Sequence, residues 1–332
     1  MLEPRFVARP PGASQDTPTR RNLPEFGELA ALVADPEVTD VFVNGVDGLW
    51  VDRGAGLLRQ PSLELDEGRL RELAVRLIAL GGRHIDEATP CVDVRLHDGI
   101  RVHAVLPPIS TGGTLISIRL PRFRRLSLDD LERAGFFADV PAASVVHLVE
   151  RRANVLITGA AGSGKTTLLS AMLASADPSD RIVAIEDVAE LHVEHQHFVS
   201  LEARQANLEG AGGVGMERLV REALRMRPDR LVVGECRGAE VRELLAALNT
   251  GHDGGAGTLH ANSLGDVPAR MEALGALAGL GPTAIARQTV SAIGAVLHLE
   301  RRGGVRRLAQ LGSFELDDRD RLTTVEAPPV SP

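Results

Sequence analysis

Asn154-Val-Leu-Ile-Thr-Gly159-Ala-Ala-Gly-Ser-Gly-Lys165-Thr166 is the stretch that decides the fold of this chain. Its first five residues, 154–158, are typical of a buried strand, and they lead directly into a glycine-rich turn. The run Leu168-Leu-Ser-Ala-Met-Leu that follows is typical of a helix. The turn matches the pattern G-x-x-x-x-G-K-[ST] in full, and a strand before it and a helix after it are the context in which this pattern binds phosphate. The stretch therefore predicts a nucleoside-triphosphate site on an α/β fold.

The chemistry of phosphate binding explains the composition of this turn. Glycines allow the backbone to curl so that its N–H groups point at phosphate, and the start of the following helix adds a partial positive charge. Lys165 is the only lysine of the chain, and every other residue of the Lys+Arg set is arginine. A lysine supplies a compact charge between the β- and γ-phosphates, and the hydroxyl of Thr166 would hold Mg²⁺. The predicted ATP-binding residues of the turn are Gly159, Gly162, Ser163, Gly164, Lys165, Thr166 and Thr167.

The composition is that of a soluble globular protein rather than of a nucleic-acid binder. The chain has 332 residues, of which 44% are hydrophobic and 25% charged, which is enough for two domains. A net charge of −8, an aromatic content of 3% and the lack of tyrosine leave little to stack on bases, so no direct nucleic-acid partner is expected. The two distant cysteines, Cys91 and Cys236, indicate a reducing compartment.

The hydrophobic pattern divides the chain into two domains. The first mixes strands with a helix over 67–80, whereas the second alternates strands and helices, which predicts a mostly parallel sheet. The expected strands are 38–45, 49–52, 99–106 and 114–119 in the first domain and 154–158, 182–185, 231–233 and 257–260 in the second. The expected helices of the second domain are 166–174, 216–226, 240–248 and 267–277. The predicted divisions are a flexible tail (1–22), an α+β domain (23–120), a linker that includes a short helix opened by Ser127 (121–141), a P-loop domain (142–312) and a C-terminal tail (313–332).

Polar residues follow the predicted strands of the second domain. Glu186 and Glu190 come at or after the end of one strand, Glu235 follows the next, and His260 ends a third. In a parallel sheet these carboxyl ends meet at one edge, where a ligand binds. The sequence therefore predicts that carboxylates and an imidazole gather beside the P-loop.

Two further groups of residues allow more than one interpretation. Arg101 and Arg119 lie on predicted strands of the first domain, where they are ordinary strand-face charges unless they serve a site. The segment 192–197 contains three histidines, but the spacing lacks a companion ligand, so we do not predict a metal site there. The arginine-rich stretches 119–125 and 301–307 are interpreted as solvated or interface residues.

The motifs together resemble the type II/type IV secretion ATPases, most closely the TadA/CpaF branch that serves tight-adherence pili and conjugation-like systems. The segments that carry the resemblance are Gly-Ser-Gly-Lys-Thr-Thr, Ile-Glu-Asp, Leu-Arg-Met-Arg-Pro-Asp-Arg with Val-Gly-Glu, Asn-Thr-Gly-His-Asp-Gly and Thr-Leu-His-Ala-Asn-Ser, within about 38–310. The resemblance implies a RecA-like C-terminal domain, an N-terminal domain and a hexameric ring with ATP bound between domains.

The resemblance also implies roles for single residues. Glu186 falls in the acidic "Asp box" and is expected to polarise the attacking water, with Glu190 as the alternative. Glu235 matches the Walker B glutamate, but the chain has Val-Val-Gly-Glu where many P-loop enzymes have Asp before Glu, so we expect Glu235 to reach Mg²⁺ through water.

The remaining implied roles belong to basic side chains in both domains. His252 and His260 match the "His box", with His260 nearer the γ-phosphate, and Lys165 completes the expected catalytic set. Arg101 and Arg119 match N-domain arginines that approach phosphate, a placement worth about 10³–10⁵ in rate in other NTPases.

These observations predict a Mg²⁺-dependent ATPase that moves its N-terminal domain against the RecA-like core. The resemblance implies a homo-oligomeric ring and a partner in the membrane platform of a pilus or secretion machine. Because no signal peptide or apolar run of ~18 residues is present, the expected location is cytoplasmic, at the inner face of the membrane through partners. Two alternatives are a nucleic-acid-translocating RecA-like ATPase and a regulator that binds nucleotide without hydrolysing it.

Overall fold

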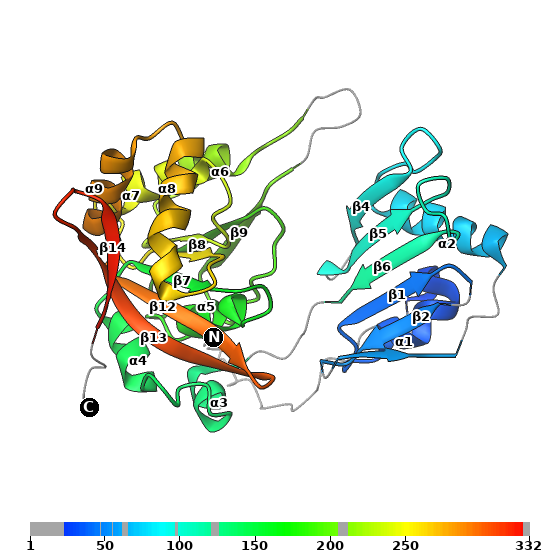
Figure 1. Cartoon of the computed structure of the whole chain (residues 1–332), viewed down its shortest axis with the longest axis horizontal. Helices are drawn as coiled ribbons and strands as arrows, with labels where there is room; N and C mark the ends of the chain where they lie inside the picture. Colours follow the sequence, from blue (N-terminus) through cyan, green and yellow to red (C-terminus); the bar gives the residue numbers. More distant parts are fainter. Residues whose placement is uncertain are drawn as a thin grey trace, which may run out of the picture. The chain divides into compact units, whose positions relative to one another are not determined.

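The computed structural model describes residues 23–46, 48–54, 56–61, 66–96, 99–120, 126–204 and 212–327. The chain divides into two compact units, Met1–Arg124 and Arg125–Pro332, which are considered separately here (Figure 1). The predicted N-terminal tail and most of the arginine-rich stretch that ends at 125 lie outside the described residues. No helix in the described ranges is both long and apolar enough to cross a bilayer.

The first unit is an antiparallel sheet with helices on one face. Its elements are η1 (Pro24–Leu29), α1 (Ala30–Ala34), β1 (Asp40–Asn44), β2 (Leu49–Asp52), β3 (Leu57–Arg59), α2 (Glu67–Leu80), β4 (Cys91–Arg95), β5 (Arg101–Val105) and β6 (Leu115–Arg119). The strand order is β3-β2-β1-β6-β5-β4. Alternate strand residues such as Val41, Val102 and Ile118 pack with Leu70 and Leu77 of α2 in one core. The helix predicted over 67–80 is confirmed, and the side chain of Asp66 caps its first turn.

The second unit is built on an eight-stranded sheet that is mostly parallel. Its strands are β7 (Val155–Gly159), β8 (Ile182–Glu186), β9 (Phe198–Glu202), β10 (Arg230–Val233), β11 (Ala256–Leu259), β12 (Ala295–Arg302), β13 (Val305–Leu316) and β14 (Leu322–Glu326). Their order is β14-β13-β12-β7-β11-β10-β8-β9. The strands from β12 to β9 in this order run parallel, whereas β13 and β14 are antiparallel additions. The predicted α/β fold is confirmed.

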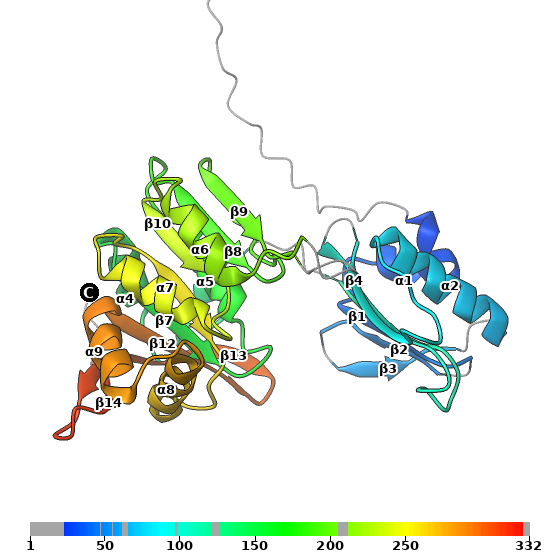
Figure 2. The same cartoon turned by 90° about the horizontal axis from the view of Figure 1, so that it is seen from above.

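Helices cover both faces of this sheet, as the view from above shows (Figure 2). The helices are α3 (Leu128–Arg133), α4 (Ala142–Glu150), α5 (Lys165–Ala174), α6 (Met216–Leu224), α7 (Glu240–Leu248), η3 (Leu264–Asp266), α8 (Val267–Leu277) and α9 (Pro282–Ala292). One core joins the sheet to α6–α9, and a second core joins it to α3–α5. Because both faces are covered, the central strands β7, β8, β10 and β11 are buried along their whole length, as expected for a parallel sheet.

The second unit extends beyond the predicted P-loop domain at both ends. The C-terminal tail expected from 313 is instead the end of β13 and the whole of β14, which pair with each other. Phe314 and Leu322 explain the difference, because both are buried in the core beside α6–α9. In the segment expected as a linker, 121–141, the short helix expected from Ser127 is present as α3, which begins with a capping box on Ser127, and Phe136 is buried in the other core.

Candidate active site

The P-loop has the geometry that the sequence predicts. β7 ends at Gly159, a tight turn follows, and α5 begins at Lys165. Gly162 and Gly164 have φ angles of 70° and 104°, a backbone conformation that glycine adopts without steric cost. The strand, the turn and the helix are therefore formed by the stretch Asn154 to Ala174 as expected.

Lys165 is folded back onto its own loop. Its side chain is 7% exposed, and Nζ donates to the carbonyl oxygens of Gly159 at 2.9 Å and Ala160 at 3.1 Å. The ammonium also lies 3.2 Å from Nδ1 of His260. Burial lowers the pKa of Lys165, and the charge of Glu235 partly offsets this effect. Lysine has no acceptor, so Nδ1 of His260 accepts this hydrogen bond.

His260 joins the lysine to a carboxylate. Since Nδ1 accepts from Lys165, the ring proton is on Nε2, which lies 2.9 Å from Oε1 of Glu235. Burial lowers the pKa of His260, and the charge of Lys165 lowers it further. A neutral ring with its proton on Nε2 satisfies both neighbours at once.

Glu235 is held from its other oxygen by an arginine that the sequence analysis did not select. Nη2 of Arg237 lies 2.7 Å from Oε2 of Glu235. Burial raises the pKa of Glu235, but this hydrogen bond and the charges of Arg237 and Lys165 outweigh it, so the pKa lies below its ordinary value. The result is a continuous polar chain from Lys165 through His260 and Glu235 to Arg237. Because only one residue separates Glu235 from Arg237 in the sequence, their contact could have been predicted.

The topology explains why these side chains meet. Glu186, Glu235 and His260 lie at or directly after the carboxyl ends of β8, β10 and β11. β11 lies between β7 and β10, so one strand separates the P-loop strand from the strand that carries Glu235. His260 follows β11 and therefore lies between Lys165 of the P-loop and Glu235.

Glu186 is held by backbone hydrogen bonds. Its side chain is 4% exposed, and Oε1 accepts from the backbone N–H groups of Glu190 at 2.8 Å and Leu191 at 3.0 Å. Gly234 lies against it, since a Cβ on that residue would be 2.6 Å from Glu186 Cγ. This contact accounts for Gly in the segment Val-Val-Gly-Glu. Glu190 is exposed, and its charge acts on Lys165 and Arg237.

Two predicted arginines lie in the first unit and are neighbours there. Arg101 on β5 and Arg119 on β6 are directly opposite each other in the antiparallel register. The same row continues to Arg95 on β4 and to Asp40 on β1. Partners in one row project from the same face of a sheet, so three arginines share this face.

His252 is not brought to the site. It lies between the end of α7 and the start of β11, on the amino side of that strand, whereas His260 follows the carboxyl end. The two histidines of the "His box" are thus at opposite ends of one strand, and His260 alone contacts Lys165 and Glu235.

The histidine segment 192–197 does not form a metal centre. In the part of the chain that the structure describes, no group of three or more His, Cys, Asp or Glu side chains has the geometry to hold a metal ion. His195 and His197 precede β9 and make other contacts: Nε2 of His195 lies 3.0 Å from the Asp177 carbonyl, and Nε2 of His197 lies 2.5 Å from Nη1 of Arg181.

Two other residues near the P-loop were not predicted. His298 on β12 is completely buried, with Nδ1 at 2.9 Å from the hydroxyl of Thr158, directly before the P-loop. Burial lowers the pKa of this ring. Arg306 on β13 donates from Nε to the carbonyl oxygen of Gly162 at 2.9 Å. Neither residue is near the P-loop in sequence, and no local signal identifies them.

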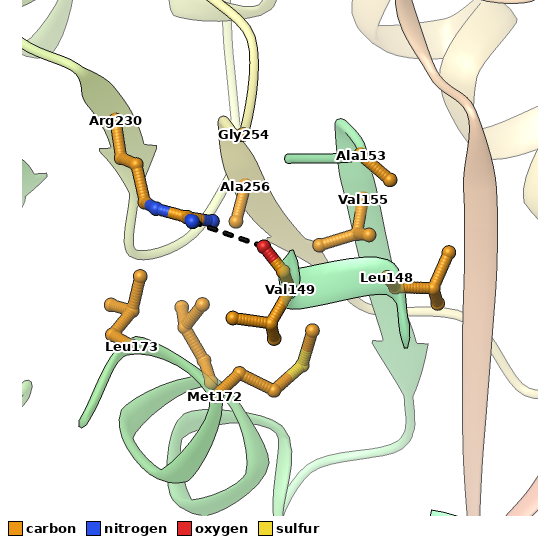
Figure 3. A pocket seen from close by; sticks show the side chains of 10 residues that line it. Leu148, Val149, Ala153, Val155, Met172, Leu173, Arg230, Gly254 and Ala256 are labelled. Atoms are coloured by element: carbon orange, nitrogen blue, oxygen red, sulfur yellow. Dashed lines mark hydrogen bonds between the residues drawn. The ribbon is translucent and has the colours of Figure 1, made fainter. Parts of the chain in front are cut away.

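A small cavity lies at the opposite, amino-terminal edge of the sheet. Figure 3 shows its lining of Leu148, Val149, Met172 and Leu173, with Arg230 beside it. Nη2 of Arg230 donates to the Val149 carbonyl at 3.0 Å. Apolar walls of this kind do not suit a phosphate.

A buried ion pair fixes the strand that carries Arg230. Nε of Arg230 lies 2.7 Å from Oδ2 of Asp180, whose other carboxylate oxygen pairs with Arg152. The side chain of Asp180 is fully buried, so this carboxylate has exchanged water for two guanidinium groups. The amino-terminal edge is therefore an anchoring region, whereas the carboxyl edge carries the candidate site.

Comparison with protein families gives one extended match. A model of the family described as "Type II/IV secretion system protein" matches residues 23–303. This range contains the P-loop, Glu186, Glu235 and His260, together with the arginine row of the first unit.

Curated relatives match nearly the whole chain. A putative conjugal transfer protein of Mycobacterium tuberculosis is 51% identical over 307 residues, which is 90% of this chain and 87% of the relative. The conjugal transfer protein TrbB of Rhizobium radiobacter is 30% identical over 299 residues, or 87% of each chain.

Solved structures share the fold. The pilus retraction motor PilT with bound ADP has a TM-score of 0.61 at 20% identity, covering 92% of this chain and 83% of its own. The ATPase DotB of Legionella pneumophila has a TM-score of 0.55 at 18% identity, covering 90% and 78%.

Proposed function

The chain belongs to the type II/IV secretion system protein family, and on that premise we propose that it hydrolyses ATP to drive a secretion, pilus-assembly or conjugation-like machine. The observation that supports this most directly is the chain Lys165–His260–Glu235 at the carboxyl edge of the sheet. A P-loop lysine and a carboxylate are groups that phosphoryl transfer uses for positioning and charge stabilisation, and an imidazole is a further donor for charge that develops in the transition state.

The proposed roles follow from the contacts. Lys165 exchanges its backbone carbonyl partners for phosphate oxygens when a nucleotide enters, since an ammonium binds a phosphate more strongly than a neutral carbonyl. Glu186 polarises the attacking water, because its buried carboxylate is held in one orientation by two backbone N–H groups. The exposed Glu190 is the second candidate for that role. His260 lies between Lys165 and Glu235, where the γ-phosphate is expected.

The donors beside the P-loop fit Mg²⁺. Thr166 offers a hydroxyl in the first turn of α5, and Glu235 offers an ionised carboxylate. Mg²⁺ prefers oxygen ligands and keeps several waters, so a site completed by phosphate oxygens and water needs no protein cage. The bound ion would neutralise part of the charge on the phosphates. Both oxygens of Glu235 already have partners, which favours contact with the ion through water.

Coupling to movement is proposed to use the arginine row of the first unit. Arg101 and Arg119 would approach the γ-phosphate while it is present and release it after hydrolysis, so that each cycle closes and opens the two units. In a homo-oligomeric ring, which we propose to be a hexamer of TadA/CpaF type, this closure acts on a membrane platform protein at the inner face of the membrane.

The test is phosphate release from Mg-ATP over a range of protein concentrations, with Lys165→Ala as the inactive control. Activity that rises with concentration and disappears in the variant supports a self-assembling ATPase. A wild-type protein that binds ATP without releasing phosphate would replace this proposal with a nucleotide-binding regulator. Strong stimulation by DNA, with a steep salt dependence, would favour a nucleic-acid motor instead.

A further inference from the structure

We infer that Arg306 is a positioning residue that holds the P-loop in its phosphate-binding conformation. The inference rests on the proposed function, because it concerns how the same site binds the phosphates of ADP and ATP. Arg306 lies 144 positions from its partner Gly162 and reaches it from the β12–β13 hairpin.

The hairpin lies beside the P-loop because of the strand order. β12 runs parallel to β7, with Leu299 opposite Gly159, so residues after Leu299 continue past the end of β7. The chain then turns and returns as β13, with Arg306 opposite Arg301 in the register. Arg306 is thus placed next to the P-loop, on the side away from β11, His260 and Glu235.

The contact involves both the head and the stem of Arg306. Nε donates to the carbonyl oxygen of Gly162 at 2.9 Å. The Cδ atom lies 3.5 Å from the position that a Cβ on Gly164 would occupy, which places the stem in van der Waals range of the turn. A hydrogen bond and a packing contact therefore fix the same turn at two points.

The chemistry of a phosphate-binding turn explains why this carbonyl needs a donor. The N–H groups of the turn bind phosphate only when they point inward, and the carbonyl groups must then find partners elsewhere. Arg306 supplies that partner for Gly162.

The other carbonyl groups of the turn are held differently. Gly159 and Ala160 accept from Lys165, which is also the side chain expected to move to the phosphates. When Lys165 moves, the bond from Arg306 to Gly162 remains. Arg306 is therefore the side chain that keeps the turn in shape during nucleotide binding.

The consequence is a specific effect on affinity. Loss of a hydrogen bond from a charged donor costs roughly tenfold in an equilibrium constant, so ADP and ATP should both bind about 10-fold more weakly to Arg306→Met. Turnover at saturating ATP should stay within about 3-fold, since Arg306 reaches the P-loop from the side away from β11 and His260 and its effect is on binding.

The experiment measures ADP and ATP affinity by calorimetry, and KM and kcat by phosphate release, for the wild type, Arg306→Met and Arg306→Gln. Arg302→Met is the matched control, because Arg302 lies on the same hairpin but projects from its other face and pairs with Glu300 at 2.7 Å. The control should bind nucleotide like the wild type. Arg306→Gln should recover part of the affinity, since it can still donate to Gly162.

A second measurement keeps the test valid if Arg306→Met is unstable. Hydrogen exchange should be faster in the peptide containing Gly162 and Gly164 for both Arg306 variants, with β10 unchanged. Wild-type ADP affinity in Arg306→Met, or unchanged exchange of that peptide in the variants, would overturn the inference. Failure of the wild type itself to bind either nucleotide would instead refute the proposed function.

Discussion

Gly234 lies so close to Glu186 that a side chain at position 234 would collide with it. A Cβ at position 234 would be 2.6 Å from Cγ of Glu186, and 3.1 Å from Oε1. Glu186 is 4% exposed and cannot move into solvent without leaving its bonds to the N–H groups of Glu190 and Leu191. Gly234, the residue before Glu235, is thereby coupled to the glutamate at the end of the neighbouring strand β8.

The first prediction is that Gly234→Ala displaces Glu186 and lowers kcat. Misplacing a reacting group by about 1 Å costs roughly 10²-fold, and overpacking costs about 1–3 kcal/mol of stability. Phosphate release and thermal unfolding measure the two effects. Gly112→Ala is the control, because Gly112 caps no helix, has no positive φ angle and has nothing within 4 Å of its Cβ position. Unchanged turnover in Gly234→Ala would show that the position of Glu186 does not limit the reaction.

The second prediction separates the two candidate bases. If Glu186 polarises the water, Glu186→Gln should lower kcat by about 10²–10⁴-fold, the usual contribution of general base catalysis. Glu190→Gln should change kcat far less, since Glu190 is exposed and its carboxylate acts on the site through its charge. The measurement is phosphate release at saturating Mg-ATP. A larger loss in Glu190→Gln than in Glu186→Gln would reverse the assignment.

The third prediction concerns pH and His298. Burial holds the pKa of this ring below its ordinary value of 6.5. Above that value the ring is neutral in the folded and unfolded states, so pH has no effect through it. As pH falls through 6.5, the unfolded ring takes up a proton and the folded ring does not, so the free energy of unfolding decreases until the folded pKa is reached.

Urea unfolding at several pH values between 5 and 8 tests this linkage. His298→Gln cannot titrate, so its free energy of unfolding should fall less than that of the wild type on acidification. A variant that loses as much stability as the wild type would show that other groups account for the acid sensitivity.

The fourth prediction concerns the amino-terminal edge of the sheet. Asp180→Asn should cost about 3–5 kcal/mol, because it leaves the buried guanidinium of Arg230 without a counter-charge. Arg152→Ala should cost about 1 kcal/mol or less, since its side chain is 44% exposed. Urea unfolding gives both values, and ADP affinity should stay unchanged because the pair lies at the edge opposite the P-loop. An equal loss of stability in the two variants would contradict the prediction that the buried pair Asp180–Arg230 stabilises the fold more than the partly exposed Arg152 does.

The sequence was most informative where chemistry restricts the residue type. The P-loop is defined by glycine conformation and a single lysine, and its strand, turn and helix follow one another without interruption, so its structure could be predicted. Helix α2 was predicted to the residue because Asp66 caps it and its apolar residues recur at helical spacing. Both cases depend on local interactions alone.

Contacts between distant segments were not predictable from one sequence. Arg306 reaches Gly162 only because β12 lies beside β7, and strand order is not encoded in any short motif. The end of β13 and the whole of β14 were mistaken for a tail because their charged and polar residues alternate with a few apolar ones, such as Phe314 and Leu322. Burial of those few residues in the core, which is a tertiary property, determines the outcome.

The single lysine makes this protein open to selective chemical labelling. Apart from the amino terminus, Lys165 is the one primary amine of the sequence, and burial lowers its pKa, which increases the fraction of the reactive neutral amine near neutral pH. An amine-directed reagent that is small enough to enter the P-loop would therefore modify a single side chain, that of Lys165. Protection of that amine by ATP or ADP would report occupancy of the site directly, without any engineered probe.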